Sequence, residues 1–186
     1  MYERYIRKFT LGDAMILVAS TALAALAIRA TLPAPFVFAR QFLTTPGVRM
    51  RAFVAIRYGL SALIPILAAL TSAVVAIRLR WPRPRLRRVA RQPGTVACTI
   101  ATMAAALEAG WIGGLLAVGS PLISPATVFV VLVNPVGFAV AAAWTALSMA
   151  GQWRPEIDWV DRVGRLCGAA WIGVAVVSDC CYFLIY

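Results

Sequence analysis

The sequence contains no histidine, and this absence excludes several classes of reaction. Without an imidazole there is no histidine-ligated haem, no HExxH zinc site and no Ser-His or Cys-His nucleophilic pair. The four cysteines also lack the CxxC spacing of redox and metal sites; they are Cys98, Cys167, Cys180 and Cys181. We therefore expect no metal and no cofactor, and an enzyme is the less favoured interpretation.

Charged residues are scarce as well. They make up 13% of the chain, against about 25% in soluble domains, while apolar residues make up 62%. With a mean hydropathy of +0.83, a chain of 186 residues cannot bury its apolar surface in one soluble core. The composition predicts an all-α integral membrane protein whose surface is largely covered by lipid.

Five predominantly apolar stretches are long enough to cross about 30 Å of hydrocarbon as helices. The predicted spans cover residues of about 11–28, 53–77, 95–118, 127–150 and 163–186, in one membrane domain over 1–186. Pro65 predicts a kink in the second span, and the NPVG segment at 134–137 interrupts the fourth.

The connections between the spans are short. Residues 36–43 alternate aromatic or apolar residues with arginine and threonine, and we expect them to lie in the membrane interface. Residues 119–127 are small, uncharged and contain proline, which predicts a tight hairpin. The loop at 151–165 is expected to contain a turn of interfacial helix, with Trp153 and Trp159 at the level of the headgroups.

Basic residues predict the orientation. The net charge is +11, and the densest basic block lies in the loop predicted over residues 78–94. Because basic residues near helix ends stay in the cytoplasm, this block predicts a cytoplasmic N-terminus and an external C-terminus. Its arginines are expected to face anionic lipid headgroups, with no nucleic acid as partner: Arg78, Arg80, Arg83, Arg85, Arg87, Arg88 and Arg91. Abundant arginine and alanine beside scarce lysine are typical of a GC-rich genome and favour a bacterial cytoplasmic (inner) membrane.

The start of the first span resembles the N-terminal signature of type IV prepilins, with matches at Phe9, Thr10, Leu11 and Met15. Lys8, however, stands where prepilins have their cleavage glycine, Asp13 replaces their glutamate, and further apolar stretches follow in place of a soluble domain. We therefore interpret Thr10 as a helix cap and Asp13 as an acid that the helix dipole favours. A signal peptide cleaved near Ala25 is the alternative.

Two acids, Glu108 and Asp179, fall inside predicted spans. An acid near the bilayer centre costs about 2.5–3.5 kcal/mol, so it normally faces protein or water. One hypothesis is a proton or cation site formed by Glu108, Asp179 and Asn134, which precedes Pro135. The alternative is that Glu108 is protonated or hydrogen-bonded to a neighbouring helix, while Asp179 pairs with Arg57.

Small residues spaced four apart predict close helix packing. They are Ala106, Gly110 and Gly114 in the third span and Gly164 and Gly168 in the fifth.

These patterns identify no reaction and no transported molecule. The favoured interpretation is a small multi-pass membrane protein that acts as a helix-packing subunit or scaffold of a membrane assembly, with other subunits or a second copy as partners. The alternative is a small transporter or channel-like protein that uses Glu108 and Asp179. The two hypotheses differ in whether Glu108 faces water or a neighbouring helix.

Overall fold

A computed structural model describes residues 9–31, 35–80, 89–117, 125–155 and 158–183 of the chain. The helices of this described part are α1 (Leu11–Thr31), α2 (Pro35–Thr44), α3 (Val48–Leu79), α5 (Pro93–Ala117), α6 (Pro125–Met149) and α7 (Trp159–Phe183). The described residues contain no β-strand, so the prediction of an all-α protein is confirmed.

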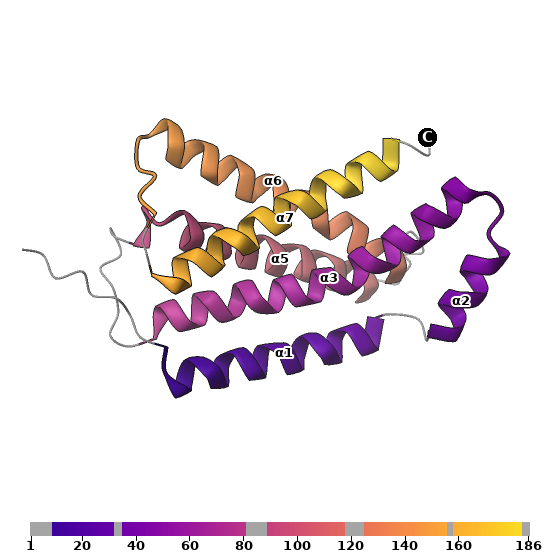
Figure 1. Cartoon of the computed structure of the whole chain (residues 1–186), viewed down its shortest axis with the longest axis horizontal. Helices are drawn as coiled ribbons and strands as arrows, with labels where there is room; N and C mark the ends of the chain where they lie inside the picture. The colour runs from indigo at the N-terminus through magenta and orange to yellow at the C-terminus, as the bar shows by residue number, and fades with distance from the viewer. Residues whose placement is uncertain (1–8, 32–34, 81–88, 118–124, 156–157, 184–186) are drawn as a thin grey trace, which may run out of the picture.

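Among the described residues, three helical segments are long and apolar enough to cross a membrane: Leu11–Arg29 in α1, Val48–Leu79 in α3, and Trp159–Cys181 in α7. The other two long helices, α5 and α6, lie within a few residues of the third and fourth predicted stretches. Figure 1 shows α3 between α1 and the remaining long helices, and α3 contacts all of them.

The beginning of α1 is fixed by a reciprocal pair of hydrogen bonds. The backbone N–H of Asp13 donates to the Thr10 hydroxyl oxygen (3.3 Å), and the backbone N–H of Thr10 donates to Asp13 Oδ2 (3.0 Å). This arrangement is a capping box in which aspartate takes the place of glutamate, and it satisfies two backbone donors that would otherwise lack partners. The predicted cap at Thr10 is confirmed.

The predicted interfacial element is helical. It forms α2, which folds back on the start of α3 through a turn at Gly47, whose φ of 81° lies in the region that favours glycine. Phe38 of α2 stacks on Tyr58 of α3 with ring centroids 4.1 Å apart. Figure 1 places α2 at one extremity of the molecule, at the start of α3.

Helix α3 is the longest and has 32 residues, which corresponds to about 48 Å at 1.5 Å per residue. It is therefore longer than the hydrocarbon layer is thick, and its first turns, with Arg49 and Arg51, extend past the other helices toward α2. Pro65 lies inside the helix, as the sequence predicts, and is buried.

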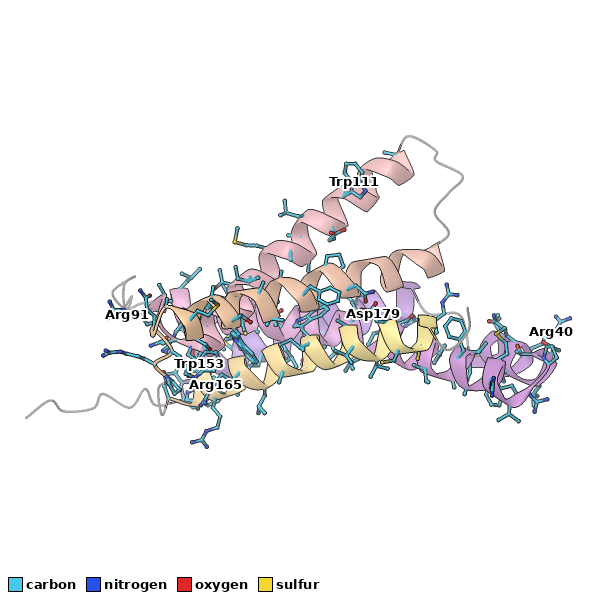
Figure 2. The ribbon with its side chains drawn as sticks, turned by 90° about the horizontal axis from the view of Figure 1, so that it is seen from above. Arg40, Arg91, Trp111, Trp153, Arg165 and Asp179 are labelled. Carbon is cyan, nitrogen blue, oxygen red and sulfur yellow. The ribbon has the colours of Figure 1, made fainter. Side chains whose placement is uncertain are left out.

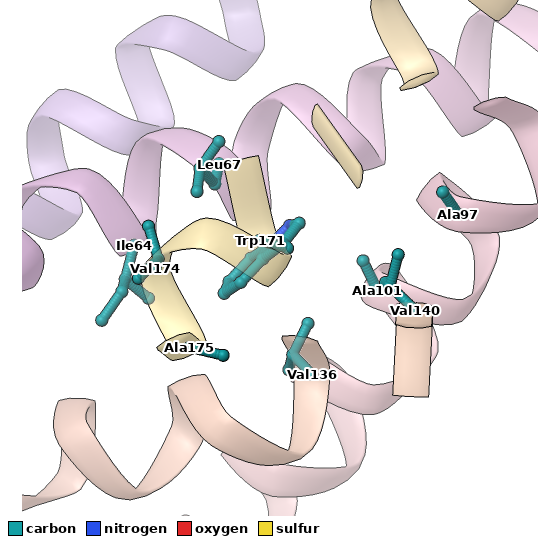
Figure 3. Packing of buried hydrophobic residues seen from close by; sticks show 9 residues of the cluster. All are labelled: Ile64, Leu67, Ala97, Ala101, Val136, Val140, Trp171, Val174 and Ala175. Carbon is teal, nitrogen blue, oxygen red and sulfur yellow. The ribbon is translucent and has the colours of Figure 1, made fainter. Parts of the chain in front are cut away.

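The core lies where α3, α5, α6 and α7 meet around the fully buried ring of Trp171 (Figure 3). Its buried members are small or branched: Ile64, Leu67, Ala97, Ala101, Val136, Val140, Val174 and Ala175. Gly137 allows α6 to approach α7 closely, since a Cβ there would lie 2.4 Å from the Ala175 Cβ. Packing between α6 and α7 therefore depends on the absence of a side chain at position 137.

The loop before α7 differs from its prediction. Residues 151–155 are not helical, and α7 begins at Trp159. Trp153 packs edge-on against Trp144, and Trp159 packs edge-on against Phe9. The aromatic residues of this loop thus contact neighbouring elements instead of forming a separate helical turn. Most of the hairpin predicted over 119–127 lies outside the described residues.

Candidate functional site

A buried polar cluster lies at the end of the bundle where α1, α5 and α7 begin and α3 ends. Its centre is Arg78, which is only 6% exposed. Arg78 Nη1 donates to Asp158 Oδ2 at 2.7 Å, Nη2 donates to Gln92 Oε1 at 2.5 Å, and Nε donates to Thr95 Oγ1 at 3.4 Å. We call these four residues the Arg78 cluster.

The Arg78 cluster joins three segments that are far apart in the sequence. Arg78 lies in the last turn of α3, Gln92 and Thr95 lie at the start of α5, and Asp158 directly precedes α7. The Thr95 hydroxyl also donates to Gln92 Oε1 at 3.1 Å. An arginine can be buried at low free-energy cost only if its charge is paired and its N–H groups find acceptors, and both conditions are met here.

Asp161 forms a second buried contact at the same end and is fully buried. Its Oδ1 accepts a hydrogen bond of 2.9 Å from the backbone N–H of Gly94, and its Oδ2 lies 3.4 Å from Arg165 Nε. The carboxylate therefore lies at the N-terminus of α5, where unpaired backbone N–H groups and the helix dipole favour a negative charge.

Glycines allow the backbones of α5 and α7 to meet at this point. A Cβ at Gly94 would lie 2.1 Å from the Asp161 carbonyl oxygen, and one at Gly164 would lie 2.5 Å from the Gly94 carbonyl oxygen. At Gly168, one turn further along α7, a Cβ would lie 2.6 Å from the Trp144 ring. Gly164 and Gly168 thus lie in tight interhelical contacts.

Asp13 is a third buried acid at this end, and like Asp161 it is fully buried. Arg80 Nη1 lies 4.0 Å from its Oδ1, and the Arg80 guanidinium covers Gly12, where a Cβ would lie 1.6 Å from Nη1. Figure 2 shows Arg91, Trp153 and Arg165 at this end of the molecule and Arg40 at the other end.

The arginines predicted to face lipid headgroups have different environments. Arg78 points into the protein because Asp158 neutralises its charge there, whereas Arg80 and Arg91 are exposed. The remaining four lie outside the described residues: Arg83, Arg85, Arg87 and Arg88.

Two of the predicted intramembrane polar residues contact each other. Asn134 Nδ2 of α6 donates a hydrogen bond to Asp179 Oδ1 of α7. The Asn134 Oδ1 atom is buried and has no hydrogen-bond partner among the described residues. Figure 2 shows Asp179 in the half of the bundle that lies away from Arg91, Trp153 and Arg165.

Glu108 and Arg57 lie apart from this pair. Glu108 is half-buried on α5, and within the described part of the chain no hydrogen bond or ion pair links it to Asp179 or Asn134. Arg57 is half-buried on α3, and its carbonyl oxygen accepts a hydrogen bond from the Ser61 hydroxyl. No ion pair between Arg57 and Asp179 is present in the described ranges.

The second half of α5 is open. Ala106, Gly110 and Gly114 are exposed, and a Cβ built on either glycine would meet nothing within 4 Å. Leu107 and Trp111 are 73% and 69% exposed. Figure 2 shows this half of α5, with Trp111, diverging from the other helices.

The four cysteines form no disulfide bond. All four are free thiols; Cys98 and Cys167 are buried, Cys181 is half-buried and Cys180 is exposed. Over the ranges that the structure describes, no three cysteine or acidic side chains come close enough to hold a metal ion.

Sequence reasoning missed the Arg78 cluster and Asp161. The available signal was the pair of acids three residues apart, Asp158 and Asp161, directly before an apolar stretch and in a chain with only seven acids. Two acids at a helix start can bind backbone N–H groups or a buried arginine.

The fold and these sites define an all-helical protein with long apolar helices and a buried polar cluster at one end of the bundle. No protein-family model matches the chain, and no curated protein or solved structure shows a significant similarity to it.

Proposed function

We propose that the chain is a five-span membrane protein in which α1, α3, α5, α6 and α7 all cross the bilayer. Each of these helices has at least 21 residues, and about 20 are enough to span the hydrocarbon layer. Successive long helices alternate in direction. Their ends at Leu11, Leu79 and Pro93 lie at the end of the bundle that holds the Arg78 cluster, which we call the Arg78 end.

In this proposal the Arg78 end faces the cytoplasm of a bacterium and the chain lies in its inner membrane. Arg78, Arg80, Arg91 and Arg165 support this orientation, because basic residues accumulate on the cytoplasmic side. The test uses Thr44→Cys and Gln152→Cys, two exposed positions at opposite ends, in a background without the four native cysteines. A membrane-impermeant thiol reagent should label position 44 in intact cells and position 152 only after permeabilisation; the reverse pattern contradicts the orientation.

Within that membrane, the protein acts as a helix-packing subunit of an assembly. The observation that carries this proposal is the open face of α5. A Cβ added at Gly110 or Gly114 meets nothing within 4 Å in the described part of the chain, and the spacing of these glycines allows another helix to approach closely. Glycine within a helix is unfavourable by roughly 0.5–1 kcal/mol relative to alanine, so glycines are useful where a second backbone must come close. Inside this bundle, Gly164 and Gly168 allow close interhelical contacts of this kind.

The experiment compares glycines that are equally open in the isolated chain. Gly110→Leu and Gly114→Leu should abolish assemblies larger than the 20.0 kDa chain, measured by cross-linking in the membrane and native mass spectrometry. Gly173→Leu on α7 is the matched control, because a Cβ there also meets nothing within 4 Å. Equal assembly in all three variants, or a monomeric wild type, would overturn the proposal.

A second candidate function, a small transporter, is favoured by the contact between Asn134 and Asp179. A carboxylate that faces an amide, with the Asn134 carbonyl oxygen left without a partner, offers oxygen atoms to a proton or a small cation. Flux of protons or Na⁺ into vesicles should then be lost in Asp179→Asn and kept in Cys180→Ser, an exposed neighbour. Labelling of Glu108→Cys by a water-soluble thiol reagent would show whether water reaches that acid. Unchanged flux in Asp179→Asn rejects transport through this pair.

A further inference from the structure

A cavity of about 370 Å³ lies between α1, α3 and α5, with Val136 of α6 and Trp171 of α7 as its floor. Alanine is the commonest lining residue, six of thirteen, with Ala24, Ala69 and Ala105 coming from three different helices. Alanine side chains are too short to meet across this space, and among the described helices α1 packs mainly on α3. The cavity therefore results from small residues at positions where larger apolar side chains would close the core.

The cavity lies at the depth of the hydrocarbon layer. On α3 it extends from Ser72 to Ile64, about 10 to 22 Å from the end of the helix at Leu79, at 1.5 Å per residue. On α1 it extends from Ser20 to Ala27, about 14 to 24 Å from Leu11. With the Arg78 end at one surface of a layer about 30 Å thick, both estimates place the cavity among the acyl chains.

The lining is almost entirely apolar. Its side-chain hydroxyl groups belong to Ser20 and Ser72, and the Ser72 hydroxyl already donates to the Ala68 carbonyl oxygen at 2.7 Å. The Trp171 indole nitrogen is buried and has no hydrogen-bond partner among the described residues. Water needs two to four polar partners at such a position, whereas an apolar cavity favours an apolar occupant.

We propose that this cavity binds one acyl chain of a membrane lipid, which enters from the bilayer beside α1. An empty cavity would leave the lining atoms without dispersion contacts on one side, and a hydrocarbon chain restores these contacts. The alanines of the three helices together form one binding site for a flexible acyl chain.

The test uses the position of Trp171 on the floor of the cavity. The full-length protein is reconstituted in vesicles with increasing fractions of a phospholipid brominated at the middle of its acyl chains, since bromine quenches indole fluorescence on contact. Subtracting the signal of Trp171→Phe isolates Trp171 from the other tryptophans. Quenching of Trp171 should saturate at a low fraction of the brominated lipid, as expected of a specific site.

Two variants fill the cavity from different walls, Ala69→Phe from α3 and Ala105→Leu from α5. In both, the saturable quenching should be lost. Ala76→Phe is the matched control, because Ala76 lies on α3 but is exposed and outside the cavity; it should behave like the wild type. If the Ala69→Phe variant loses its helical circular dichroism signal, it is misfolded, and the quenching of the Ala105→Leu variant then decides whether the proposal holds.

Three results would overturn the proposal. Quenching that rises in simple proportion to the brominated fraction shows contact with bulk lipid only. No quenching of Trp171 in the wild type shows that no chain enters. Saturable quenching that persists in both filled variants shows a lipid site elsewhere.

Discussion

The two ends of α5 are built in opposite ways. Its first turns lie among buried polar groups, where Gln92, Gly94 and Thr95 all contact other segments. Its second half presents Gly110 and Gly114 to open space. The same helix is thus held by specific contacts at one end and left available at the other, which shows that glycine alone does not indicate where this chain packs internally.

The largest effect is expected from breaking the Arg78 cluster. Asp158→Ala removes the partner of a buried arginine and should destabilise the protein by about 3–5 kcal/mol, because the charge of Arg78 is left uncompensated. Unfolding in mixed micelles measures this change.

The control for this variant is Arg91→Gln, at an exposed position of the same end, which should have little effect. The double variant with Arg78→Met and Asp158→Leu should recover much of the loss, since it removes both charges together. If Asp158→Ala unfolds like the wild type, the cluster does not hold this end of the bundle.

The next largest effect is expected at the contact between α5 and α7. Gly164→Ala places a Cβ 2.5 Å from the Gly94 carbonyl oxygen, so the two backbones must separate. Overpacking of this kind costs about 1–3 kcal/mol. The same unfolding measurement applies, and Gly173→Ala, at an open position of the same helix, is the control. Equal stability of the two variants would show that α5 and α7 are not in close contact.

A glycine-to-alanine substitution should have the opposite effect on stability in the open half of α5. Gly110→Ala meets no atom within 4 Å and should stabilise the isolated chain by roughly 0.5–1 kcal/mol, because alanine loses less conformational entropy in a helix. Unfolding of the monomer in detergent tests this sign. Destabilisation would mean that the position is already occupied within the chain.

The smallest effect is expected at the rim of the Arg78 end. Arg80 is exposed and lies 4.0 Å from Asp13, so Arg80→Gln should cost no more than about 1 kcal/mol, and less at high salt. Comparing unfolding at low and high ionic strength checks this. A loss as large as that of Asp158→Ala would place Arg80 among the buried contacts instead.

Local patterns predicted the helices well. Apolar stretches of sufficient length marked all five long helices, and Thr10 with Asp13 marked the start of the first. These features depend on residues close together in the sequence, which is why a single sequence reveals them.

The candidate site could be predicted only in part. Glu108, Asp179 and Asn134 were proposed to form one site. Asn134 and Asp179 are hydrogen-bonded, whereas Glu108 lies apart from them, and the role of the pair stays a prediction. The burial of Arg78 was not predicted, because a basic residue at the end of an apolar stretch is normally attributed to topology. Its partner Asp158 is 80 residues away, and no local pattern specifies a contact over that distance.

The separation between Arg78 and Asp158 also sets an order of events during synthesis. The chain emerges from its N-terminus, so α3 is complete well before Asp158 exists. During that interval Asp158 is not yet available to Arg78, which in the proposed orientation is one of the basic residues that keep this end in the cytoplasm. Once α7 arrives, Asp158 neutralises the charge of Arg78 inside the bundle. Under the proposed topology, one arginine therefore serves two successive purposes, first as a signal for insertion and later as part of the folded interior.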